Sequence, residues 1–154
     1  MSHRKLLSLG LIILGVTTLA ACGVNPASVV DQVYLVVAGI LPIIGGLVGV
    51  LLPNEVGAIT SATNMTLAAL NALKQLVDDY HSSPTGSKLA NVQAAFADVR
   101  QNLAQLEAAA RVRDLTTQKR LLAIVTAVTQ SLAALESAMA ADHAKAVVAS
   151  QARS

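Results

Sequence analysis

Aromatic residues, charged residues and cysteine are all scarce in this chain of 154 residues. It has no tryptophan, and only 2% of its residues are aromatic, namely Tyr34, Tyr80 and Phe96. Few rings are therefore present to line or stack against a ligand. The single cysteine, Cys22, excludes a disulfide within the chain, so a folded domain must rely on packing. No glycine-rich phosphate loop, paired Cys/His metal spacing or nucleophile elbow occurs, and the sequence predicts no enzyme, metal or cofactor.

The N-terminal residues combine a short basic stretch, an apolar run and a small-residue site. His3, Arg4 and Lys5 precede the apolar residues 6–19, an order typical of a secretory signal. The sequence Leu19-Ala20-Ala21-Cys22 then places one aliphatic and two small side chains before the cysteine. Residues 1–22 resemble the signal peptide and lipobox of a bacterial lipoprotein.

This resemblance implies where the protein is located and how it is attached to a membrane. Residues 1–21 would be removed, and Cys22 would become an N-terminal residue carrying a diacylglycerol and a further acyl chain. Several acyl chains hold a protein firmly to a membrane, whereas one holds it only marginally. The resemblance also implies a cell-envelope protein facing the periplasm. Gly23, in place of an aspartate, favours the outer membrane under the sorting rule of enteric bacteria.

The remaining chain is formally neutral. Loss of residues 1–21 takes Arg4 and Lys5 from the 11 basic residues, leaving nine basic against nine acidic residues. Nucleic acid is therefore an improbable partner, because its binding needs a basic face. Neutrality also argues against membrane binding carried by the overall charge.

Residues 22–33 are predicted to form a lipidated tether, followed by an apolar segment over residues 34–52. This segment of nineteen residues has no charge, and as a helix it would be about 28 Å long, close to a bilayer core of roughly 30 Å. It contains Pro42 and four glycines, of which Gly45 and Gly49 have the spacing of a close helix contact in lipid.

Three interpretations of the apolar segment remain open. It could be a transmembrane helix kinked at Pro42, a pair of short helices turning at Gly45-Gly46 against the membrane surface or the bundle, or a buried core helix. Interior proline is tolerated better in membrane helices, which favours membrane association. The first positive charge after the segment is Lys74, too distant to act as a cytoplasmic sorting signal. Incomplete crossing, with the remaining helices in the periplasm, is therefore favoured.

The rest of the chain predicts an all-α fold, a small three-helix up-down-up bundle over 53–143. Its helices are expected near 54–80, 88–112 and 115–142, with a frayed tail over 144–154. Asn54 and Asp114 are good N-cap residues, so a break near Asp114 is preferred to one helix over 88–143. Two seams at helical spacing should face the core: Leu89, Val92, Phe96, Val99, Leu103, Leu106 and Ala110, then Leu121, Val125, Val128, Leu132, Leu135 and Met139.

Only a few side chains suggest chemistry. Asp78 and His81 could share a metal ion, but a solvated helix end is the more ordinary interpretation, since so few ligands cannot close a site. Ser82 and Ser83 adjoin His81 without an evident orienting group, so they do not predict a nucleophile. Met65 and Met139 are expected in the core. A basic cluster could dock phosphate head groups or an acidic partner, or be a solvated bundle end; it comprises Arg111, Arg113, Lys119 and Arg120.

The sequence as a whole predicts a lipid-anchored bacterial envelope protein with a structural or protein-interaction role. Its membrane contacts would be the lipid on Cys22 and the apolar residues 34–52. Its partner would be a second copy of the chain or another envelope protein. Two alternatives remain: a two-span membrane protein of the phage-lysis, holin-like type, with residues 6–21 retained as the first span, and a helical module that binds an apolar ligand between its helices.

Overall fold

The computed structural model describes residues 25–154, which are helical apart from short connections. The helical segments are α2 (Pro26–Ala38), α3 (Ile40–Gly45), α4 (Pro53–Ser82), α5 (Gly86–Ala109) and α6 (Leu115–Ala152). No strand occurs among the described residues, where β pairing is limited to one isolated bridge. The predicted all-α class, a helical bundle that follows an N-terminal apolar helix, is confirmed.

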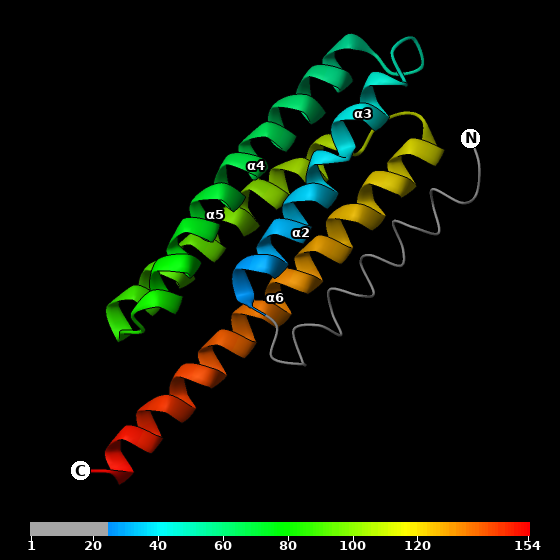
Figure 1. The fold of residues 1–154 in the computed structure, drawn as a ribbon. Helices are drawn as coiled ribbons and strands as arrows, with labels where there is room; N and C mark the ends of the chain where they lie inside the picture. The colour runs from blue at the N-terminus through cyan, green and yellow to red at the C-terminus, as the bar shows by residue number, and fades with distance from the viewer. Residues whose placement is uncertain (1–24) are drawn as a thin grey trace.

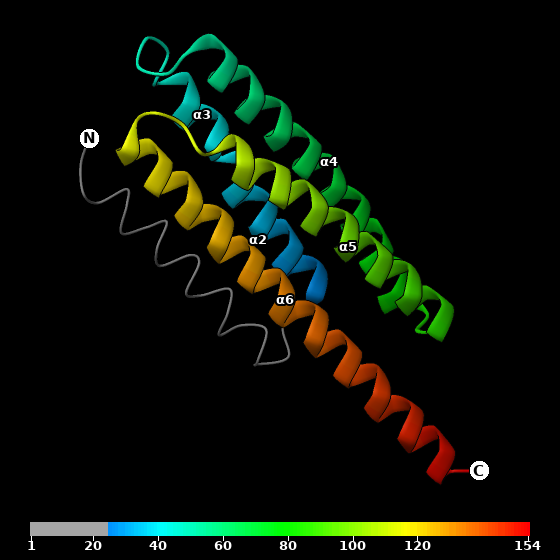
Figure 2. The ribbon, with the colours of Figure 1, turned by 180° about the vertical axis from the view of Figure 1, so that it is seen from behind.

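The helices form an up-down-up-down bundle (Figure 1). The segments α2 and α3 run end to end between α4 and α6, α4 returns, α5 runs up again and α6 returns beside it. Helix α2 contacts α4 and α6, and α5 contacts the same two helices, so four antiparallel neighbours close a ring around the core. The view from behind shows α5 and α6 side by side, joined by a short loop at the end where α3 also finishes (Figure 2).

The apolar segment is a full member of this bundle and not an appendage to three helices. Val37 and Ile40 are completely buried and Ile44 is 2% exposed, within the same core as α4, α5 and α6. The structure thus agrees with packing against the bundle, which two of the three interpretations included. Pairing this helix with α4 and α6 hides an apolar stripe that a three-helix bundle would leave in solvent.

The break in the apolar segment lies at Gly39, and the turn lies at Gly45-Gly46 as the second interpretation predicted. Proline has no N–H to donate and its ring crowds the carbonyl one turn earlier. Pro42 thus disrupts the backbone pairing near Ala38, where α2 ends, and α3 resumes at Ile40. By length and composition, Pro26–Gly45 and Leu115–Ala152 could each cross a membrane, with mean hydropathies of 1.9 and 1.5. Core helices of soluble proteins pass the same test.

Two predicted boundaries differ from the structure. Residues 26–33, expected in the tether, form the first turns of α2, because the Asn25 side chain accepts a hydrogen bond from the Ala27 N–H at 3.0 Å and Pro26 begins the helix. Residues 144–152, expected to fray, continue α6 as an exposed extension. Alanine and valine with no glycine or proline give that stretch nothing that stops a helix.

The predicted N-cap of α4, Asn54, is also two positions from the observed one, Leu52. The helix begins at Pro53, so Asn54 lies in its first turn. The Glu55 carboxylate accepts the Leu52 N–H at 2.9 Å instead. Further along α4, Thr63 and Thr66 are fully buried, and their hydroxyls donate to the carbonyls of Ile59 and Ala62 at 2.7 and 2.8 Å. These local bonds let two polar side chains enter the core without a partner on another helix.

The break between the two seams is confirmed. Helix α5 ends at Ala109 and α6 begins at Leu115, with the Asp114 carboxylate accepting the Thr117 N–H at 2.8 Å. Every predicted position of both seams is buried, Leu89 being the most exposed at 9%. Met139 is 4% exposed, as predicted, but the prediction for Met65 was wrong, since that side chain is 48% exposed. Near Met65, the side chains of α4 that face the core are those of Thr63 and Thr66, both fully buried.

Candidate functional site

The predicted lipidation site, Cys22, lies outside the described residues. The described chain begins with Asn25 and enters α2 at Pro26. Asp31 on this helix forms an ion pair with Lys74 near the end of α4, at 2.8 Å, which raises the pKa of the Lys74 ammonium through the hydrogen bond. The start of α2 thus lies at the end of the bundle that holds the α4–α5 connection. We call this the anchor end.

The predicted pair Asp78 and His81 belongs to the cluster Asp78-Asp79-Tyr80-His81 at the end of α4, whose side chains have different partners. Asp79 pairs with Lys88 across the α4–α5 turn at 3.0 Å, whereas Asp78 and His81 are exposed. Among residues 25–154 no group of three or more His, Cys, Asp or Glu side chains is placed to hold a metal ion. The described structure therefore gives the Asp78 and His81 pair no further ligand.

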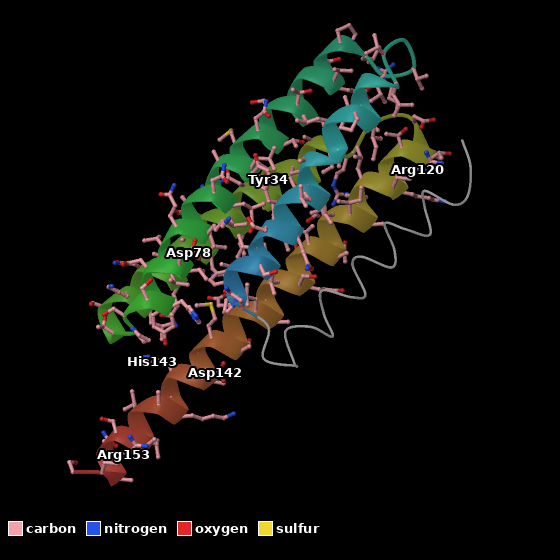
Figure 3. All side chains as sticks on the ribbon, viewed as in Figure 1. Tyr34, Asp78, Arg120, Asp142, His143 and Arg153 are labelled. Atoms are coloured by element: carbon pink, nitrogen blue, oxygen red, sulfur yellow. The ribbon has the colours of Figure 1, made fainter. Side chains whose placement is uncertain are left out.

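Tyr80 makes a long-range contact with α6. Its hydroxyl lies 2.9 Å from His143 Nδ1, and the two rings are 5.9 Å apart in a tilted arrangement. Burial, with the nearby Asp142 charge, raises the pKa of the Tyr80 phenol. Figure 3 shows Asp142 and His143 where α6 leaves the bundle. Sequence reasoning missed this pair because it depends on which helices become neighbours.

The serines beside His81 have structural roles in the local turn. Ser82 Oγ donates to the Asp78 carbonyl at 2.9 Å, which satisfies one of the last carbonyls of α4. Ser83 is the C-cap residue, whose N–H bonds to the Asp79 carbonyl. The arrangement stabilises a helix end and brings no base to either hydroxyl.

The basic cluster lies at the other end of the bundle, which we call the tip. The tip comprises the α3–α4 loop, residues 46–52, and the α5–α6 connection with the start of α6, residues 110–120. Arg111 pairs with Glu107 at 3.3 Å, while Arg113, Lys119 and Arg120 are exposed. Arg120 marks this end in Figure 3, far along α6 from His143.

Glu55 joins the two loops of the tip. Its carboxylate accepts the Leu52 N–H at 2.9 Å and the Arg113 N–H at 3.0 Å. These bonds, in that order, hold the pKa of the Glu55 carboxyl below its usual value. A single side chain therefore fixes two connections that lie 58 residues apart in the sequence.

An open groove of about 420 Å³ runs between α4 and α5. Its floor is built from alanines, with polar side chains of α5 along one wall; its lining is Met65, Ala68, Ala69, Ala72, Ala95, Asp98, Gln101, Asn102 and Gln105. Small side chains allow another helix to approach closely. The shape can therefore accept an extended or helical partner segment.

Comparison with known proteins gives no relative. No family model, no curated protein and no solved structure matches this chain.

Proposed function

We propose that this chain is a lipid-anchored protein of the bacterial envelope, whose helical bundle has a structural or protein-interaction role on the periplasmic side. The observation that carries the proposal is the sequence Leu19-Ala20-Ala21-Cys22 at the end of a signal-like segment. Lipidation of Cys22 would hold the bundle at the membrane without help from the remaining residues.

The position of the folded part supports this arrangement. Only three residues, 23–25, separate Cys22 from the first helical residue, so the lipid would lie within about 15 Å of the start of α2. The packed structure begins at the start of α2, where Asn25 caps the helix and the side chains of Ala27 and Val29 are already buried. A tether this short keeps the anchor end of the bundle next to the bilayer.

The packing of α2 and α3 supports a bundle outside the cytoplasm. Val30, Val33, Val37 and Ile40 are at most 2% exposed, since α2 packs against α4 and α6 and α3 packs against α4. An apolar segment whose side chains already have protein neighbours does not need lipid to hide them. The holin-like alternative would require this segment to leave the core and cross the membrane.

The surface supports an interaction role. The α4–α5 groove exposes Met65, and the extension of α6 exposes Val147 and Val148 at 42% and 65%. Helical grooves and unpaired helix ends of this kind serve as docking faces for other helices. A second copy of the chain or another envelope protein is the partner class that we propose.

Replacement of Cys22 by Ser tests the anchor. We expect the variant to keep residues 1–21 and to lack the lipid mass, because the thiol that takes up the diacylglycerol is gone. The control is Ala21→Gly, which keeps a small residue before the cysteine and should be processed normally. Unchanged mass and unchanged membrane retention in Cys22→Ser would refute the proposal.

A fusion of a periplasm-dependent phosphatase to Ser154 tests the side of the membrane. An active fusion in intact cells is expected for a lipoprotein with an external bundle. An inactive fusion at normal protein levels would place the bundle in the cytoplasm and favour the two-span, holin-like alternative.

A further inference from the structure

The extension of α6, residues 144–152, leaves the bundle as an uncovered helix. Met139 is 4% exposed and His143 is half-buried, whereas every residue from 144 to 154 is exposed. The helix nevertheless continues to Ala152. Figure 3 shows Arg153 at its far end, well past His143, which marks where α6 leaves the bundle. Within residues 25–154 no other element packs over this stretch.

Two contacts place the start of α2 level with the point where the extension begins. The ion pair between Asp31 and Lys74, at 2.8 Å, fixes α2 against the antiparallel α4. Asn25 lies six positions before Asp31 and Tyr80 lies six positions after Lys74, so each is about 9 Å further towards the anchor end. The Tyr80 hydroxyl lies 2.9 Å from His143 Nδ1. Asn25, Tyr80 and His143 are therefore at about the same level of the bundle, and the extension projects beyond it (Figure 1).

The link to the proposed lipid limits the distance between this level and the membrane. The lipid on Cys22 would lie within about 15 Å of the start of α2. From His143 to Ala152 the helix rises about 14 Å past that level. The tip lies about 30 Å away in the opposite direction, the length of the 20 residues Pro26–Gly45. The extension can therefore reach the bilayer that holds the lipid, whereas the tip points away from it.

One side of the extension is apolar. Ala144 and Val148 are four residues apart, which places them on one face of the helix. Val148 and the adjoining Val147 are 65% and 42% exposed. Asp142 and Arg153, which carry opposite charges, lie on the other side of the helix. The apolar side is therefore suited to a lipid surface, and its contact does not require anionic lipid.

We propose that the extension lies in the head-group layer of the membrane that carries the lipid on Cys22, held there by the short link, with Val147 and Val148 towards the acyl chains. This proposal rests on the proposed lipidation. Two valines bind a membrane weakly by themselves, but the short link makes the contact intramolecular and raises its effective concentration. Contact at both the lipid and the extension would orient the bundle with its tip away from the membrane. The α4–α5 groove would then stay accessible to a protein partner.

Depth-sensitive quenching tests this contact in the protein purified from bacterial membranes. Val148→Cys is labelled with an environment-sensitive fluorophore and reconstituted into phosphatidylcholine vesicles that carry a nitroxide on the acyl chain. The matched control is Val50→Cys at the tip, because Val50 is a valine of similar exposure, 62%. Lipidation blocks the Cys22 thiol, so the label enters only at the new cysteine. The intact mass of each sample reports whether Cys22 is lipidated, which separates failure of the contact from failure of the anchor.

We expect strong quenching at position 148 and little at position 50. Insertion of about ten flexible Gly/Ser residues between Gly23 and Val24 should lower the ratio of bound to unbound extensions several-fold, because a longer link lowers the effective concentration. In a lipidated sample, quenching at 148 no greater than at 50 would overturn the proposal, as would quenching that the longer link leaves unchanged. Protection of the probe at 148 that depends on protein concentration would overturn it too, and would assign the extension to contact with a second copy. An unlipidated sample would overturn the anchor and this proposal together.

Discussion

Ile40→Ala tests whether the apolar helix belongs to the core of the bundle. The Ile40 side chain is completely buried in α3, which packs against α4, so truncation removes its contacts and leaves a cavity. Such a change costs about 3 kcal/mol of unfolding free energy, within the roughly 2–5 kcal/mol found for isoleucine truncations in protein cores. For a domain of this size the midpoint of thermal unfolding should fall by roughly 10 °C.

The matched control is Leu35→Ala on α2, the helix that precedes α3 in the same apolar segment. Leu35 is 69% exposed, so its truncation should change the unfolding free energy by less than about 0.5 kcal/mol. Thermal unfolding of both variants, followed by circular dichroism in mild detergent, measures the difference. Equal, small losses in the two variants would refute the packing of α2 and α3 described here, because a lipid-facing segment would not distinguish the two positions.

Two further predictions concern hydrogen bonds at the ends of helices. The Thr117 hydroxyl and N–H lower the pKa of Asp114, and the Leu52 and Arg113 N–H groups lower that of Glu55, from ordinary values of 3.8 and 4.5. A carboxyl whose pKa is lower in the folded state than in the unfolded state stabilises the fold at pH values above its unfolded-state pKa. That stabilisation is lost as the pH falls through the folded-state pKa. The double variant Asp114→Asn, Glu55→Gln should therefore be less stable than wild type at pH 7 and approach it near pH 3, measured by urea midpoints; a constant deficit would contradict this. Tyr80→Phe removes the bond to His143 and should cost about 1 kcal/mol, with faster amide hydrogen exchange over 140–152; unchanged exchange there would show that the bond does not hold the α6 extension.

The sequence predicted the helices more fully than their arrangement. Hydrophobic spacing identified the buried faces of α5 and α6, and Asp114 marked the boundary between them, because both signals are local. The bundle topology required a different kind of information. Val37 and Ile40 are covered by protein only if the other helices leave an apolar surface for them to pack against. The sequence of one segment does not contain that information.

The same limit explains what was missed at the candidate sites. Asp78 and His81 were weighed as a metal pair against a solvated helix end, and both side chains are exposed at the end of α4. The Tyr80–His143 contact joins residues 63 positions apart. Met65 is of a residue type common in protein cores, yet its side chain lines the α4–α5 groove. Each outcome follows from the packing of neighbouring helices.

The intact mass of the protein extracted from bacterial membranes tests the central claim most directly. We predict a chain that begins at Cys22, with the added mass of a diacylglyceryl group and one further acyl chain. A mass corresponding to a chain that retains residues 1–21, or to one with an unmodified Cys22, would contradict it.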